Sequence, residues 1–141
     1  MKKITARLLL LLSVHANVYA ADLIEVYQQA LTKGVAQAKN TSYPDLNGNM
    51  FIFAHSSVDF YEAQKYNSVF YLLSKLEKED KIDIYFKEKK YTYSVTEKKT
   101  VDPTEISYLE NKSIEKTLTL MTCWPPGTTY QRLIVKATLV R

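Results

Sequence analysis

The sequence predicts a single, mainly β domain with one or two short helices, folded as a closed or nearly closed barrel. Segments 82–86 and 91–95 alternate apolar and polar side chains, which is the pattern of half-buried strands. Segment 117–122 is rich in β-branched residues, which favour strands. All three glycines lie in the expected connections. With 46% apolar residues among 141, the chain has enough hydrophobic material for one core, which excludes wholesale disorder.

The first half of the chain is expected to supply one helix and one buried strand. Asp22 and Glu25 have the spacing of a capping box, and apolar residues then recur at helical spacing, so the sequence predicts a helix over 23–33. Residues 39–48 have the composition of a loop. The apolar run 49–54 is too short for a helix, and we therefore expect it to be a buried strand.

The second half should contain one or two helical turns followed by two hairpins. Phe70, Leu73 and Leu76 recur at helical spacing ahead of a charged turn. The lysine-rich segment 87–90 is expected to close the first hairpin, and the proline-rich loop 124–128 the second. The remaining expected elements are a turn or short helix beginning at 102–105 and a final strand over 133–140.

Residues 1–20 have the form of an export signal. Three basic residues lead into the apolar run Leu8–Val14, and small residues precede a cleavage point before Ala21. The apolar stretch is shorter than the roughly 17–25 residues of a spanning helix, so cleavage is favoured and an uncleaved anchor stays open as the alternative. We therefore expect an exported, extracytoplasmic protein at the cell surface or membrane, whose domain comprises residues 21–141 and which contacts the membrane only through its N-terminal segment.

Charge argues against a nucleic-acid partner. Residues 1–20 hold three of the 19 basic side chains and none of the 15 acidic ones, so residues 21–141 carry 16 against 15 and are nearly neutral. The stretch Lys81–Lys99 interleaves lysines with tyrosines as a stacking platform would, but acidic residues interrupt it. A hairpin with a solvated lysine face is the simpler interpretation.

Three residue types stand out because residues 21–141 use each of them sparingly. Cys123 is the only cysteine in the chain, which excludes an intrachain disulfide and a structural zinc site of cysteines, and we expect no metal or cofactor. His55 is the only histidine after residue 20 and directly follows the strand 49–54. Arg132 is a rare arginine in a chain that otherwise uses lysine, which is typical of a position needing a planar donor fork.

Hairpin geometry predicts that two of these residues meet. If the loop after Cys123 closes a hairpin without a bulge, a register pairing 123 with 132 places Cys123 opposite Arg132 on one face, with Cβ atoms about 5 Å apart. Each residue also has an ordinary structural interpretation, such as a buried inert thiol, a surface histidine or an arginine that decorates a strand. Asp59 is a candidate to orient the His55 imidazole, with a solvated loop acid as the alternative.

These residues lie in motifs that resemble the sortase family. Thr119–Cys123 resembles the sortase signature TLxTC, and Phe51–Ser56 resembles the strand end that carries the sortase histidine. Arg132–Val135 is similar to the strand with the sortase arginine, and Cys123–Thr128 to the loop of class D- and E-like sortases. The resemblance covers about residues 30–141 and implies a sortase barrel of nominally eight strands. Sortases have one or two strands before the segment that matches residues 33–36, whereas this chain has an export signal and a predicted helix there. Whether the first one or two strands of the barrel are missing is therefore left open.

The resemblance implies an exported cysteine transpeptidase, a thiol peptidase of the hydrolase class. It would cleave an LPxTG-like sorting signal of surface proteins through a thioester and transfer it to an amine of a cell-wall precursor or a pilin lysine. By resemblance Cys123 is the nucleophile, His55 the acid and base, and Arg132 the stabiliser of the oxyanion. Thr122 and Trp124 are expected to contact the substrate. The alternative is an inactive, truncated barrel that acts as a non-catalytic binding module.

Overall fold

The computed structural model describes residues 7–11, 35–56, 70–110 and 112–140. Strands dominate these ranges, and the helical parts are two short 3₁₀ segments, η2 (Tyr71–Lys75) and η3 (Ser107–Leu109). The strands of the described residues are β1 (Arg7–Leu11), β2 (Ala36–Gln37), β3 (Gly48–Phe53), β4 (Lys81–Phe86), β5 (Lys89–Val101), β6 (Lys116–Trp124) and β7 (Gln131–Leu139). The predicted mainly β fold with few helices is therefore confirmed.

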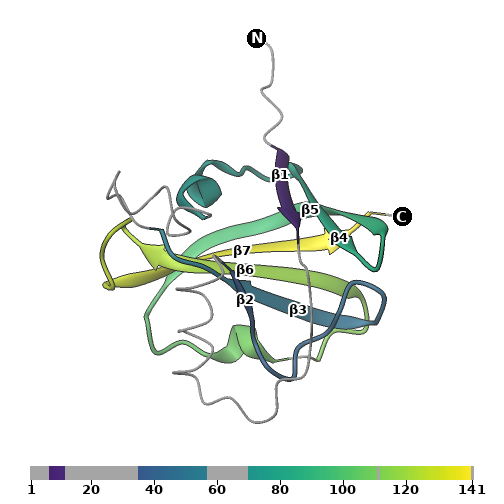
Figure 1. Ribbon diagram of the computed structural model, residues 1–141. Coiled ribbons are helices and arrows are strands. Elements are labelled where there is room, and N and C mark those ends of the chain that lie inside the picture. The colour runs from purple at the N-terminus through teal and green to yellow at the C-terminus, as the bar shows by residue number, and fades with distance from the viewer. Residues whose placement is uncertain (1–6, 12–34, 57–69, 111, 141) are drawn as a thin grey trace.

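The described strands form one sheet in the order β1-β4-β5-β7-β6-β3-β2. β1 pairs with β4 and β3 with β6 in parallel, and the other neighbouring pairs are antiparallel. Figure 1 shows the sheet curling around its core as a half-barrel, in which β1 and β2 are the edge strands. The described part of the chain thus supplies seven strands of the nominal eight, and its sheet has two edges instead of closing on itself.

Strand β3 is covered on both faces, which explains its uninterrupted apolar sequence. All six of its residues are buried. Because side chains alternate between the faces of a strand, Met50 and Ile52 enter the large core, while Phe51 and Phe53 enter a smaller one. The smaller core contains Ala36, Ala38, Phe51 and Phe53, with Tyr108, Leu109 and Met121 packed against it. This smaller core covers the face of the sheet on which the site lies.

The first hairpin is tighter and its second strand longer than the sequence predicts. Lys87 and Glu88 both have positive φ, 48° and 62°, as in a two-residue turn whose twist matches that of the strands. β5 then runs on to Val101, because β7 pairs with it along this length around a bulge between Val95 and Glu97. The sequence analysis missed this extension because the second half of β5 is charged. An exposed strand face tolerates lysine and glutamate, so no alternation of apolar and polar residues marks the strand there.

The N-terminal strand falls inside the segment interpreted as an export signal. Arg7–Leu11 pairs in parallel with β4, from Arg7 beside Lys81 to Leu11 beside Tyr85. These residues thus form an edge strand of the sheet, which the sequence analysis did not predict. Export and cleavage stay predictions. The predicted helix over 23–33 and the candidate Asp59 lie outside the described residues. Within the described ranges, no helix has the length and apolar character needed to cross a membrane.

Candidate active site

The site forms where three neighbouring strands of the sheet, β3, β6 and β7, meet at one rim. β3 and β6 are parallel, with Phe53 beside Met121, and the ladder continues as the Ala54 backbone N–H donates to the Met121 carbonyl at 3.2 Å. Because parallel strands keep their register, the next step places His55 alongside Cys123. The two residues therefore lie at the same end of the sheet, although Cys123 is 68 positions after His55 in the chain.

The β6–β7 hairpin places Arg132 opposite Cys123. The register runs without a shift from Thr117 beside Thr138 to Trp124 beside Gln131, and Cys123 pairs with Arg132. This confirms the register predicted from the hairpin. Directly opposed residues of an antiparallel pair point to the same face, so the thiol and the guanidinium share one side of the sheet.

All three candidate catalytic side chains line one pocket, which we name the strand-end pocket. It is open to solvent and has an empty volume of about 280 Å³. Alternation along β3 and β6 puts Phe53 and Met121 on the same face as His55 and Cys123, so the pocket has an apolar side next to its reactive groups. Its lining residues are Phe53, Ala54, His55, Met121, Thr122, Cys123 and Arg132.

The electrostatics of the pocket favour a neutral imidazole. Burial lowers the pKa of His55 below its ordinary value, because the charged imidazolium loses solvation there. The Cys123 thiol is half-buried and forms no disulfide. The Arg132 guanidinium is anchored at the end of the hairpin, since its Nη1 donates to the carbonyls of Thr129 at 3.3 Å and Gln131 at 3.2 Å. A thiol, a neutral base and a fixed cation thus share one pocket.

The two predicted substrate-contact residues have different surroundings. Thr122 lines the strand-end pocket but is only 3% exposed, and its hydroxyl donates to the Ala54 carbonyl at 2.7 Å. Trp124 packs against the large core and is not among the described residues that line the pocket. The sequence analysis expects Trp124 to contact the substrate, and its contacts in the structure are with the large core.

Ser56 belongs to the site although the sequence analysis did not single it out. Its hydroxyl donates to the Cys123 carbonyl at 2.7 Å, and its own carbonyl accepts a hydrogen bond from the Gly127 N–H at 2.9 Å. Ser56 therefore connects the end of β3 to the end of β6 and to the loop behind it. The only feature of the sequence that indicates a role for Ser56 in the site is its position directly after His55.

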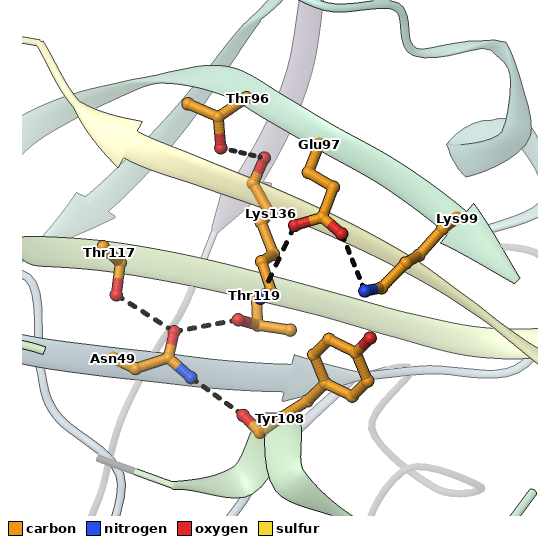
Figure 2. A network of polar contacts seen from close by, with 8 residues as sticks. All are labelled: Asn49, Thr96, Glu97, Lys99, Tyr108, Thr117, Thr119 and Lys136. Atoms are coloured by element: carbon orange, nitrogen blue, oxygen red, sulfur yellow. Dashed lines mark hydrogen bonds and ion pairs between the residues drawn. The ribbon is translucent and has the colours of Figure 1, made fainter. Parts of the chain in front are cut away.

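A second polar assembly occupies the other end of the same face, about six residues or 20 Å back along β6. Asn49 is buried; its Oδ1 accepts hydrogen bonds from Thr117 at 3.2 Å and Thr119 at 2.9 Å, and its Nδ2 donates to the Tyr108 carbonyl at 3.0 Å (Figure 2). We call these residues, with the ion pairs described next, the Asn49 network. A pocket with an empty volume of about 590 Å³ lies beside it.

Two lysines of the Asn49 network lie over the ring of Tyr108. Lys99 Nζ is 5.0 Å and Lys136 Nζ is 4.7 Å from the ring centroid, and both pair with Glu97, at 2.8 and 3.6 Å (Figure 2). The hydrogen bond from Lys99 lowers the pKa of Glu97, and the same bond raises the pKa of Lys99. The network thus ties η3 to β3, β5 and β7 and holds it over the small core.

Comparison with known proteins agrees with this fold. The Sortase domain family matches residues 11–140, and the chain therefore belongs to the sortase family. Sortase D of Bacillus subtilis (strain 168) is 30% identical over 95 residues, which cover 67% of this chain and 43% of that protein. The chain thus spans less than half the length of this curated relative.

Solved structures show the same relationship. A Clostridium perfringens Sortase D5 transpeptidase superposes with a TM-score of 0.66 at 28% identity, over 86% of this chain and 68% of that one. A Clostridium perfringens sortase C, solved with the C-terminal cell wall sorting motif, has a TM-score of 0.66 at 29% identity, over 79% and 58% of the two chains. The predicted membership of the sortase family is therefore confirmed.

Proposed function

We propose that this protein is a cysteine transpeptidase that acts on sorting-signal peptides. The observation that carries the proposal is the convergence of Cys123, His55 and Arg132 in one pocket at the ends of three adjacent strands. A thiol, an imidazole and a guanidinium within one open pocket supply a nucleophile, a proton carrier and an anion stabiliser. Membership of the sortase family supports assigning them to acyl transfer.

The first half of the reaction forms a thioester. The neutral His55 imidazole accepts the proton of the Cys123 thiol, and the resulting thiolate attacks the scissile carbonyl while the Arg132 guanidinium stabilises the negative charge that develops on the carbonyl oxygen. The His55 imidazolium donates its proton to the leaving amine as the C–N bond breaks. The acyl group is then bound to the Cys123 sulfur, and His55 is left neutral.

The second half transfers the acyl group to an amine. Neutral His55 accepts a proton from the incoming amine as its nitrogen attacks the thioester carbonyl, and the Cys123 thiolate leaves. Burial lowers the pKa of His55, so the neutral form that this step needs is available near neutrality. Water in place of the amine gives hydrolysis by the same steps.

We propose an LPxTG-like sorting signal as the substrate, cleaved between Thr and Gly. The sortase C neighbour was solved with a cell wall sorting motif, which supports this class of peptide. The apolar side of the pocket, with Phe53 and Met121, suits an extended peptide with apolar residues ahead of the cleaved bond. The proposed acceptor is the amine of a cell-wall precursor or a pilin lysine, and the proposed location is outside the cytoplasm.

Capture of the acyl-enzyme tests the proposal directly. The 141-residue chain is incubated with a panel of LPxTG-like peptides, with and without a glycine or lysine amine, and intact masses are measured. The expected result is an adduct that carries the peptide up to its Thr, disappears when amine is added and is absent in Cys123→Ala. If the folded chain gives no adduct with any peptide, or if Cys123→Ala gives the same adduct, the proposed chemistry is wrong.

A non-catalytic binding module is the competing function, because the sheet of the described residues has two edges and does not close on itself. A charged thiol reagent separates the two functions. The transpeptidase should be alkylated rapidly at Cys123 and lose its turnover, with protection by a sorting-signal peptide. A binding module should bind the peptide with unchanged affinity in Cys123→Ala and form no adduct.

A further inference from the structure

Two buried hydroxyls lie beside the catalytic pair and bond to the backbone of the opposite strand. Thr122 Oγ1 donates to the Ala54 carbonyl and Ser56 Oγ donates to the Cys123 carbonyl, each at 2.7 Å. The two residues are 3% and 4% exposed. Neither hydroxyl is needed for the chemistry of thioester formation described above.

The two hydrogen bonds are reciprocal. The hydroxyl of Thr122, the residue before Cys123, donates to the carbonyl of Ala54, the residue before His55. The hydroxyl of Ser56, the residue after His55, donates to the carbonyl of Cys123. Both bonds cross between the ends of β3 and β6, beyond the last paired residues Phe53 and Met121. Side-chain hydroxyls therefore hold the two chain segments together after the regular strand pairing has ended.

The loop behind Cys123 adds a third tie to the same position. The Gly127 N–H donates to the Ser56 carbonyl at 2.9 Å, and Gly127 has φ of 78°, a conformation that suits glycine. Ser56 is thus bonded through its hydroxyl to Cys123 and through its carbonyl to the loop. A displacement of Ser56 would move the backbone of its neighbour His55 relative to the thiol.

We propose that Ser56 and Thr122 are positioning residues that keep the His55 imidazole and the Cys123 thiol side by side; this inference rests on the proposed function. They act through the backbone atoms of the residues that flank the reacting groups. A loosened pair misplaces the imidazole, and such misplacements lower turnover by as much as about 100-fold. The bonds do not touch the substrate, so binding should change little.

The experiment compares variants that remove or keep each hydroxyl in the 141-residue chain. Thr122→Val and Ser56→Ala remove a hydroxyl, whereas Thr122→Ser and Ser56→Thr retain one. Thr96→Val is the matched control, because the Thr96 hydroxyl also donates to a strand carbonyl, that of Lys136 at 3.2 Å, but is exposed at the other end of the face. Circular dichroism and thermal melting establish that each variant is folded.

The kinetic readout separates positioning from substrate contact. We expect Thr122→Val and Ser56→Ala to lower kcat about 10- to 100-fold with KM within about twofold, and the hydroxyl-retaining variants to recover most of kcat. If the loss lies in KM alone, if kcat stays within twofold of the unchanged protein, or if Thr122→Ser is as slow as Thr122→Val, the proposal is wrong. Should Thr122→Val fail to fold, Ser56→Ala, which adds no atoms, decides the case.

A second readout needs no peptide substrate. The rate of Cys123 alkylation is followed against pH in each variant and in His55→Gln, which identifies the inflection that the imidazole causes. We expect that inflection to shrink in Thr122→Val and Ser56→Ala and to persist in Thr96→Val. An unchanged inflection in both overturns the proposal. If the unchanged protein cleaves no peptide, the proposed function fails, and this measurement alone still decides whether the hydroxyls position the pair.

Discussion

The two ends of one sheet face differ in what their polar side chains bond to. In the Asn49 network, side chains mostly bond to one another: two threonine hydroxyls donate to Asn49, and Glu97 pairs with two lysines. At the strand-end pocket, hydroxyls bond to backbone carbonyls, and the thiol, imidazole and guanidinium line an open cavity. Polar groups that bond to one another hold the fold together, whereas the hydroxyls that bond to the backbone hold in place the side chains that we propose to react.

Replacing the guanidinium should have the largest effect, and only at the strand-end pocket. We expect Arg132→Lys to lower kcat/KM by about 100-fold or more, because an ammonium cannot reproduce the planar donor fork that we propose to stabilise the oxyanion. Steady-state cleavage of a sorting-signal peptide measures the change. Lys136→Arg is the control, since Lys136 belongs to the Asn49 network, and an equal loss there would remove the distinction between the two ends.

The pH profile of cleavage should reveal the half-buried imidazole of His55. Burial lowers the pKa of His55, so the imidazolium loses its proton at a lower pH than an ordinary histidine near 6.5. kcat/KM should therefore rise with pH through an inflection below about 6.5, because only the neutral imidazole can accept the proton of Cys123. Measurements from pH 5 to 10 test this, and a flat profile would contradict the paired roles of His55 and Cys123.

Removing the amide of Asn49 should affect stability and not chemistry. Asn49→Ala leaves the Tyr108 carbonyl and two threonine hydroxyls without their buried partner, so the free energy of unfolding should fall by about 1–3 kcal/mol. Urea unfolding measures this change. The rate of Cys123 alkylation at fixed pH in the folded variant should stay within about twofold, and a larger change would show that the two ends are coupled.

The ion pairs of the Asn49 network should have the smallest effect. Glu97→Gln removes the carboxylate that pairs with Lys99 and Lys136, all of them partly exposed. Because exposed pairs contribute little, the melting temperature should fall by less than about 4 °C, and the difference should shrink in high salt. Thermal melts at low and high ionic strength check this, and a larger fall that is insensitive to salt would show that Glu97 does more than pair with lysines.

The parts of the site that rest on local geometry could be predicted from the sequence. The pairing of Cys123 with Arg132 follows from a hairpin without a bulge, in which the register is fixed by the turn. The position of His55 followed from an apolar run too short to be a helix. In both cases the residues that determine the geometry lie next to those that it positions.

Other features depend on contacts that no local pattern contains. The extension of β5 to Val101 is determined by its partner β7, and the parallel strand β1 by the distant β4. The hydroxyl bond of Ser56 reaches a residue 67 positions away, so nothing near Ser56 in the chain indicates its partner. The packing of Trp124 against the core could not be predicted from the sequence, because a tryptophan after a cysteine suits a groove and a core equally well.

The pairing of β1 with β4 has a consequence for the exported form. If cleavage before Ala21 occurs as predicted, β4 loses the neighbour that covers its outer row of backbone groups, and a bare strand edge invites other chains to add to it. Strand β4 carries a charged residue, and charged residues on an edge strand discourage such aggregation. Asp83 of β4 accepts a hydrogen bond from Thr92 and pairs with Lys90, so a foreign strand that paired with β4 would lie beside a charged residue.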